Sequence, residues 1–156
     1  MLTVSIDEQD VKGFMNILFK ESPFDGFEVR ELSIVAFCEL KIIGALSKTV
    51  KARNPETQNR AFALWSEVKP YAFNFIKGGV KPEGIKIIFS GAKTLLDEIS
   101  PNAAAVFINM FYDAESVRFT AGVSQKEFSL NKDLDIKWEE YVTEFFKTLK
   151  VKFRCL

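Results

Sequence analysis

The sequence predicts an α+β fold, in which a mainly antiparallel sheet is covered on one face by helices. Two observations carry this prediction. Stretches with alternating apolar residues are joined by short turns and interspersed with amphipathic helical stretches. In addition, the order strand, helix, strand, strand occurs twice, in residues 1–48 and again in residues 84–130. A doubled β-α-β-β(-β) unit is therefore one arrangement that the sequence suggests.

The first unit opens with a strand over residues 2–6 that leads into an amphipathic helix over residues 7–20. Asp7 is a favourable N-cap, and apolar residues then recur at helical spacing on one face. Proline and glycine after this helix predict that it ends and that Phe24 to Gly26 form a turn. Residues 27–46 are strand-like but too long for one strand, so we predict two strands that break near residues 36–39.

A helical insertion over residues 54–79 separates the two units. Asn54 and Pro55 have the composition of a helix start. Because proline has no backbone N–H and disfavours helical geometry in the residue before it, Pro70 predicts an interruption. Gly78 and Gly79 predict the C-terminal cap, followed by a loop.

The second unit, residues 84–130, begins with a strand over residues 85–89 and a helix over residues 92–99. Two apolar stretches, residues 105–112 and 117–121, are separated by four residues, which predicts a hairpin. A further strand is predicted over residues 127–130. A final amphipathic helix spans residues 132–149, and the tail after it either adds an edge strand or frays.

Composition narrows the class of function. At 156 residues the chain has the length of one domain. It has no histidine, which removes the usual general base at neutral pH together with Ser-His, Cys-His and imidazole-zinc sites. We therefore expect a protein that is not an enzyme. Lys and Arg balance Asp and Glu at 21 each, which argues against a dedicated nucleic-acid binder but leaves room for a local basic face.

The apolar residues predict a core rich in phenylalanine. There are 16 phenylalanines but only 3 tyrosines and 2 tryptophans. Because phenylalanine has no polar group to satisfy, most of these rings should be buried. Trp65 and Trp138 lie on apolar helical stripes, so core packing is expected for both.

The two cysteines and the N-terminus predict a cytoplasmic protein. Cys38 and Cys155 are far apart and have no metal-like spacing. Cys38 follows Phe37 in a strand-like stretch and is expected to be a small buried residue. The acidic start of the chain does not resemble a signal peptide, and no apolar run approaches the roughly 20 residues of a membrane span. No membrane partner is expected.

The candidate binding residues are Lys77, Gly78, Gly79 and Lys81. Backbone N–H groups at the glycines and the two ammonium groups could hold a phosphate. The alternative is a helix C-cap and a flexible loop, because no Walker pattern follows and the glycines end a helix. The helix C-cap and flexible loop are the favoured interpretation.

Residues 131–135 place oxygen-bearing side chains at alternate positions, as a calcium loop does. Such a loop also needs glycine at its sixth place and glutamate at its twelfth, where this chain has Ile136 and Val142. The pattern therefore predicts helix capping by Asn131 or Asp133 instead. No metal site, no cofactor and no catalytic residues are expected.

Most of the chain resembles a family of uncharacterised small bacterial proteins, a domain of unknown function from anaerobic Gram-positive bacteria. The residues that carry the first part of this resemblance are Trp65 to Pro70, Phe73, Ile76 to Gly78 and Pro82. Those that carry the second part are Phe107 to Met110, Tyr112, Gly122, Phe128 to Leu130, Trp138, Val142, Phe145 and Phe146. The resemblance implies no activity and assigns no functional residue.

The order of elements also resembles one domain of a DNA sliding clamp, which is built from two such units. The stretches that carry this resemblance are residues 2–18, 93–99, 117–119 and 126–130. It implies a doubled clamp-like fold. The two helices that would face DNA carry Lys12, Lys20 and Lys93 but a larger number of acids, so the resemblance does not extend to encircling DNA.

The leading hypothesis is a non-catalytic cytoplasmic binding or protein-interaction module. Its partner would be another protein or a second copy of the chain. The alternatives are a nucleic-acid-associated clamp-like protein and, behind it, an enzyme that uses carboxylates or a lysine. The sequence specifies no ligand for any of the three.

Overall fold

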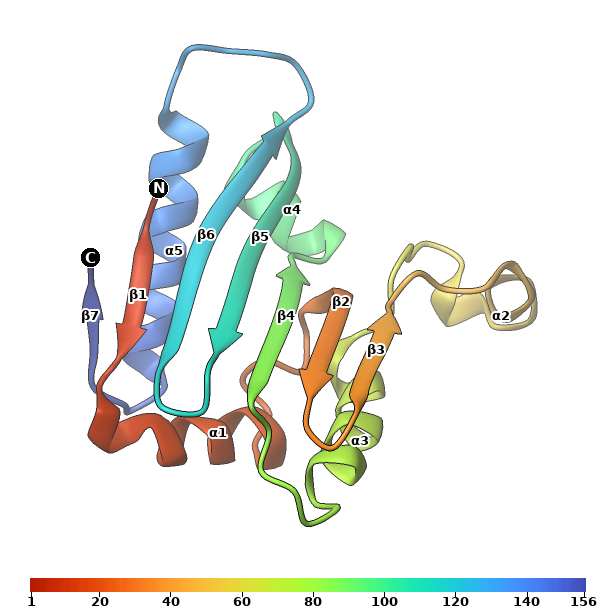
Figure 1. Cartoon of the computed structure of the whole chain (residues 1–156). Helices are drawn as coiled ribbons and strands as arrows, with labels where there is room; N and C mark the ends of the chain where they lie inside the picture. Colours follow the sequence, from red (N-terminus) through yellow and green to blue (C-terminus); the bar gives the residue numbers. More distant parts are fainter.

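Seven strands form one sheet in the order β3-β2-β4-β5-β6-β1-β7 (Figure 1). The computed structural model describes residues 1–156. The strands are β1 Thr3–Ile6, β2 Glu28–Val35, β3 Glu39–Ile43, β4 Gly84–Ser90, β5 Ala103–Tyr112, β6 Val117–Gln125 and β7 Phe153–Cys155. Every neighbouring pair is antiparallel, which confirms the predicted type of sheet.

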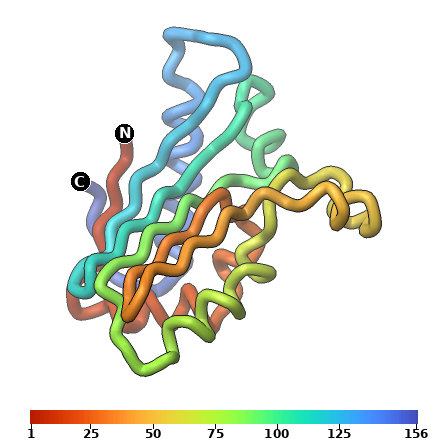
Figure 2. The backbone as a smooth tube through the Cα atoms, turned by 45° about the vertical axis from the view of Figure 1, so that its right-hand side comes forward, coloured from red at the N-terminus to blue at the C-terminus, as the bar shows by residue number.

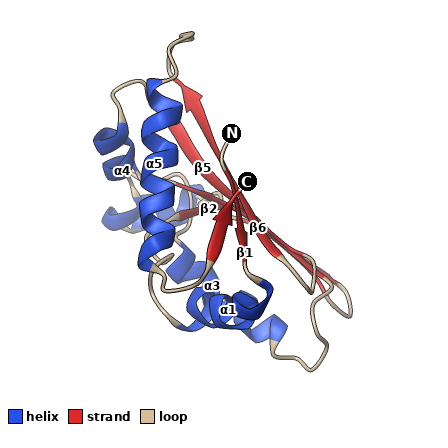
Figure 3. Ribbon diagram, turned by 90° about the vertical axis from the view of Figure 1, so that its left-hand side faces the viewer, coloured by secondary structure: helices blue, strands red, loops and turns tan.

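Helices cover one face of this sheet and leave the other bare. The helices are α1 Val11–Lys20, α2 Lys48–Arg53, α3 Trp65–Ile76, α4 Lys93–Ile99 and α5 Asp133–Thr148, with short 3-10 turns η1 Glu8–Asp10 and η2 Pro55–Thr57. Seen along the sheet, α1, α3, α4 and α5 all lie on the same side (Figure 3). The short helix α2 projects beyond the edge of the sheet (Figure 2). None of the helices combines the length and apolar character needed to cross a membrane.

The order β-α-β-β does occur twice, but the two units share a single interlaced sheet. Strands β4, β5 and β6 of the second unit lie between β2 and β1 of the first. The first strand of the chain therefore pairs with β6 and, at its outer side, with β7. The tail thus adds an edge strand, one of the two outcomes predicted for it.

A phenylalanine-rich core fills the space between sheet and helices, as predicted. Six of the 16 phenylalanines are buried, which is fewer than the predicted majority: Phe14, Phe24, Phe27, Phe89, Phe119 and Phe146. The two tryptophans are also buried and use their indole N–H groups to join elements. Trp65 donates to the carbonyl of Leu18 at 2.9 Å, and Trp138 donates to the carbonyl of Phe107 at 3.0 Å.

The helical insertion differs from the prediction at both of its key residues. Asn54 caps only the 3-10 turn η2, where its Oδ1 accepts from the N–H of Glu56 at 3.0 Å. The chain then forms two isolated bridges, Phe62 with Ala45 beyond the end of β3 and Leu64 with Glu28 of β2. Helix α3 starts at Trp65 and continues through Pro70 without a break. The carbonyl that loses its partner belongs to Ser66, which is exposed, so water can bond to it.

Two further predictions are wrong. Residues 127–130 form no strand, because Lys126 and Glu127 are held at the start of β5 instead of along the free edge of β6. Phe128 is 87% exposed there, and Asn102 holds the segment through two bonds to the backbone of Glu127. Cys38 is exposed, because it lies in the turn between β2 and β3 rather than in a strand.

Candidate functional site

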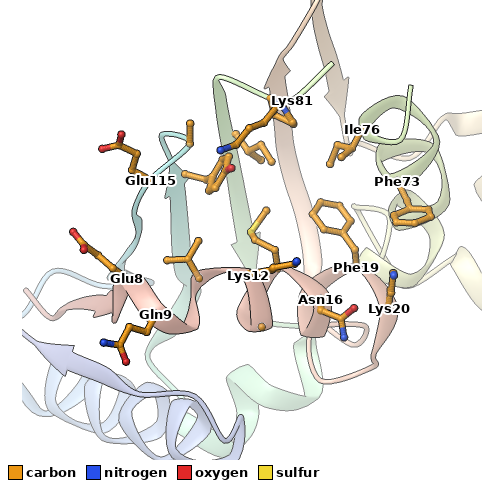
Figure 4. A pocket seen from close by; sticks show the side chains of 17 residues that line it. Glu8, Gln9, Lys12, Asn16, Phe19, Lys20, Phe73, Ile76, Lys81 and Glu115 are labelled. Carbon is orange, nitrogen blue, oxygen red and sulfur yellow. The ribbon is translucent and has the colours of Figure 1, made fainter. Parts of the chain in front are cut away.

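An open groove of about 940 Å³ runs between α1, the end of α3 and the β5–β6 turn (Figure 4). We call it the α1–α3 groove. Seventeen residues line it. They come from η1 and α1, from the last turn of α3, from the α3–β4 connection and from the adjoining ends of β4 and β5. The groove therefore depends on segments that are far apart in the sequence.

Helix α1 contributes one wall because it has two apolar edges. Phe14 and Leu18 point into the core and are fully buried. Met15 and Phe19, one position further round the helix, pack against that core only in part and line the groove. Gly13 also lines the groove, and a Cβ placed on it would meet no atom within 4 Å. The missing side chain at Gly13 thus leaves room along this wall.

One end of the groove is aromatic. The rings of Phe19 and Phe73 lie 6.4 Å apart, and Ile76 lies beside them on the last turn of α3 (Figure 4). Phe19 in turn packs on Trp65 at 5.6 Å, which fixes its ring against the core. This end offers a preformed apolar surface to a ligand.

The charged side chains of the groove have no partners within the protein. Lys12 and Lys20 on α1 and Lys81 on the α3–β4 connection take part in none of the six ion pairs. Glu8 and Glu115 lie together at the end opposite the aromatic rings and are also unpaired (Figure 4). The groove therefore presents an acidic end, ammonium groups along its walls and an apolar end.

The polar side chains of the groove are carboxylates, ammonium groups, amides and one phenol. Its lining contains no serine, threonine or cysteine that could act as a nucleophile. Burial, and secondarily the carboxylate of Asp113, raises the pKa of Tyr112, whose ring lies in the groove. The hydroxyl of Tyr112 therefore stays protonated at neutral pH and can donate a hydrogen bond to a ligand.

Of the four residues predicted as a phosphate cradle, the structure brings only Lys81 to the groove. The N–H of Gly78 bonds to the carbonyl of Phe75 at 3.3 Å, and Gly79 has a φ of 97°, as at many helix ends. Lys77 lies over the ring of Phe73 at 5.8 Å. These contacts support the alternative interpretation, a helix C-cap followed by a loop.

Sequence reasoning missed the rest of the groove. The spacing on α1 predicts only a helix face, because the nearness of this helix to Phe73 and Tyr112 follows from the sheet order. One signal was present in the sequence. Gly13 weakens a helix that otherwise has good helix-forming residues, and such a glycine usually has a packing or functional reason.

A second unusual group lies on β2, on the bare face of the sheet. The Glu28 side chain is buried but forms no ion pair and no side-chain hydrogen bond. Burial raises the pKa of Glu28, although the positive charges of Arg30 and Arg60 act in the opposite direction. The net effect disfavours the charged carboxylate in the folded protein.

Comparison with known proteins identifies a family and no activity. Neither the curated proteins nor the solved structures gave a match. A family model does match, over residues 16–154, and its description is a family of unknown function, DUF5721. This stretch begins within α1 and ends within β7, so it includes six of the seven strands in whole or in part. The predicted membership of an uncharacterised family is confirmed, and the chain belongs to the family of unknown function DUF5721.

Proposed function

We propose that the protein is a non-catalytic interaction module that binds a peptide segment of a partner protein in the α1–α3 groove. The segment would carry an apolar anchor side chain next to acidic residues. The observation that carries this proposal is an apolar-ended groove whose lysines have no partner in the protein.

The size and lining of the groove support a binding role. Its volume of about 940 Å³ lies near the upper end of the usual range for ligand sites. Phe19 and Phe73 offer rigid apolar area at little entropic cost, and Met15 can adapt its shape to an incoming side chain. An anchor side chain of a peptide would displace water from this end.

The charges support an acidic segment. Lys12, Lys20 and Lys81 stand around the apolar end and the middle of the groove without carboxylate partners. Acidic residues beside the anchor would pair with them, and the acids Glu8 and Glu115 at the far end would repel a segment bound in reverse. Opposite charges therefore set the direction of the bound segment.

The composition of the groove and the state of the cysteines support a non-catalytic role in the cytoplasm. A groove without hydroxyl or thiol side chains, in a chain without histidine, has few means of catalysis, so we propose that the protein is not an enzyme. Cys38 and Cys155 are exposed free thiols, which suits the reducing cytoplasm as the site of action.

The test measures binding of synthetic peptides by NMR of methionine methyl groups. The protein has 3 methionines, and of these Met15 lines the groove whereas Met110 is fully buried in the core. A peptide with a phenylalanine or leucine anchor flanked by aspartates should shift the Met15 signal and leave Met110 unchanged. The same anchor flanked by lysines should bind more weakly.

Two variants make the test specific to the groove. Gly13→Leu places a side chain in open space along the wall and should abolish binding. Lys12→Gln with Lys20→Gln should weaken the acidic peptide only. The matched control, Lys93→Gln with Lys137→Gln, removes two exposed lysines outside the groove and should have no effect. Equal binding by Gly13→Leu, or turnover of a substrate in the groove, would refute the proposal.

A further inference from the structure

The bare face of the sheet carries a line of positive charge across its full width. The strand registers place one residue from each strand side by side in a single row, because each is the direct partner of the next. We call it the cation row. In sheet order it consists of Lys41, Ser33, Lys86, Phe111, Arg118, Ser5 and Arg154.

The cation row has four positive side chains and no carboxylate of its own, and its Ser33 donates to the carboxylate of Glu39 at 3.1 Å. Lys86 and Arg118, on either side of the central strand, form no ion pair. The outer two cations have partners at the surface. Lys41 contacts Glu31 at 3.2 Å, and Arg154 lies 3.9 Å from the carboxylate of Asp7, just before η1. At about 4.8 Å per strand, the row extends over about 29 Å. The balanced charge of the whole chain thus hides a basic line on one face.

The middle of the cation row is hollowed and aromatic. A depression of about 330 Å³ is lined by Ser33, Lys86, Phe111 and Arg118, together with the start of β4 and the β5–β6 turn. The ring of Phe111 is 41% exposed, and the ammonium of Lys86 lies 5.9 Å from its centre. The one carboxylate at the rim, that of Asp113, already accepts three hydrogen bonds that close the β5–β6 turn.

A second aromatic ring, that of Phe107, lies further along β5 on the same face. Phe107 is four residues from Phe111, which places the two rings about 14 Å apart along the strand. The guanidinium of Arg30 lies over Phe107 at 5.2 Å and over Phe62 at 4.1 Å, and its Nε donates to Ser90 at 3.1 Å. Side chains of the protein itself therefore already stack at this end of the face, which leaves Phe111 as the exposed ring of the cation row.

From these contacts we propose that the bare face binds single-stranded nucleic acid, with a base stacked on Phe111 and phosphates paired with Lys86 and Arg118. Aromatic rings interleaved with cations on an open sheet suit unpaired bases, because a base must leave a duplex before its face can stack on a side chain. The depression shares Ile85 and Tyr112 with the lining of the α1–α3 groove, but the two sites share no cation.

The test is fluorescence anisotropy with labelled oligothymidine and oligouridine of about 20 nucleotides, titrated from about 50 to about 200 mM salt. Each phosphate contact contributes about 0.7 to the slope of log affinity against log salt, so Lys86→Gln with Arg118→Gln should reduce the slope by about 1.4. Phe111→Ala should weaken binding by roughly 5- to 150-fold, the usual loss for one stacked base. All three residues are exposed, so these variants should fold.

The control variant Lys93→Gln with Lys137→Gln removes the same charge from the helical side and should leave the affinity and the slope unchanged. Duplex DNA of equal length should bind more weakly than either single strand. The proposal is overturned if the slope of the Lys86 and Arg118 variant equals that of the wild type, if Phe111→Ala binds normally, or if polyglutamate displaces the oligonucleotide as well as an unlabelled strand does.

Discussion

Replacing Phe24 by alanine should be among the most damaging single changes to the stability of this protein. The side chain is fully buried. Its ring lies 5.2 to 6.3 Å from five other rings. These belong to Phe14, Phe27, Phe89, Phe119 and Phe145. Because they come from α1, the loop after it, two strands and α5, Phe24 joins nearly every layer of the core.

Phe24→Ala should lower the free energy of unfolding by about 4 kcal/mol. Exposing a phenylalanine that was fully buried costs about 3 kcal/mol. Each aromatic pair adds about 0.5 to 1.5 kcal/mol beyond the area term, although neighbouring rings will partly close the cavity. These terms are not additive, so the expected loss is set by the range of about 3 to 5 kcal/mol found for buried phenylalanine replaced by alanine. Such a loss is a large fraction of the stability of an ordinary domain.

The assay is equilibrium unfolding in urea, followed by tryptophan fluorescence. With a slope of about 2 kcal/mol per molar, the midpoint should fall by about 2 M, and the melting temperature should fall by about 8 to 16 °C. Phe37→Ala is the matched control, because Phe37 is 68% exposed and contacts one ring, that of Phe75 at 5.5 Å. A loss below about 1.5 kcal/mol for Phe24→Ala, or equal losses for the two variants, would refute the view of Phe24 as the centre of the core.

Three further predictions concern stability. Gly44→Ala should lower the free energy of unfolding in urea by more than about 3 kcal/mol, because the new Cβ would lie against the backbone oxygen of Val29. Gly13→Ala should instead raise it by up to about 1 kcal/mol, since that site is helical and open. Changes in the free energy of unfolding that have the same sign for both variants would contradict this prediction. Glu28→Gln should stabilise the folded protein at neutral pH, because burial raises the pKa of Glu28. The gain should vanish below the ordinary glutamate pKa of about 4.3, where the carboxyl is protonated in both the folded and the unfolded protein. A gain that persists in acid would point to another cause. Trp65→Phe should lower the free energy of unfolding by about 1 to 3 kcal/mol, because the hydrogen bond to the carbonyl of Leu18 in α1 is lost. The fluorescence of Trp138 reports the unfolding. An unchanged free energy of unfolding would show that this hydrogen bond is dispensable.

The parts of the fold that sequence reasoning predicted correctly are those with strong local periodicity. The stripe of α5 and the hairpin of β5 and β6 each depend on contacts between near neighbours in the chain. The errors occur where distant partners decide. The predicted turn at Phe24 to Gly26 is correct, but the sequence does not show that rings of four other elements surround Phe24. Phe128 has the spacing of a strand residue, but Asn102 holds the residue before it at the start of β5.

The candidate sites were less predictable than the fold for the same reason. Lys81 was singled out as part of a phosphate loop, whereas its neighbours in space are residues of α1 and the β5–β6 turn. The cation row is even less visible in the sequence, since its seven residues lie on seven strands and no two are within five positions of each other. Only the strand registers bring them together.

The interlaced sheet order also constrains how the chain can fold as it is synthesised. Strand β1 is made early, but Val4 pairs with Phe119 of β6 and with Cys155 of β7. At about 5 to 20 residues per second, β1 waits roughly 6 to 23 s for its first partner to be made. During that interval β4 can already pair with β2, so the ribosome-bound chain can hold a partial sheet with an open β4 edge. Insertion of the first strand is then a late event in folding, and the rate of release from the ribosome becomes part of how this fold is reached.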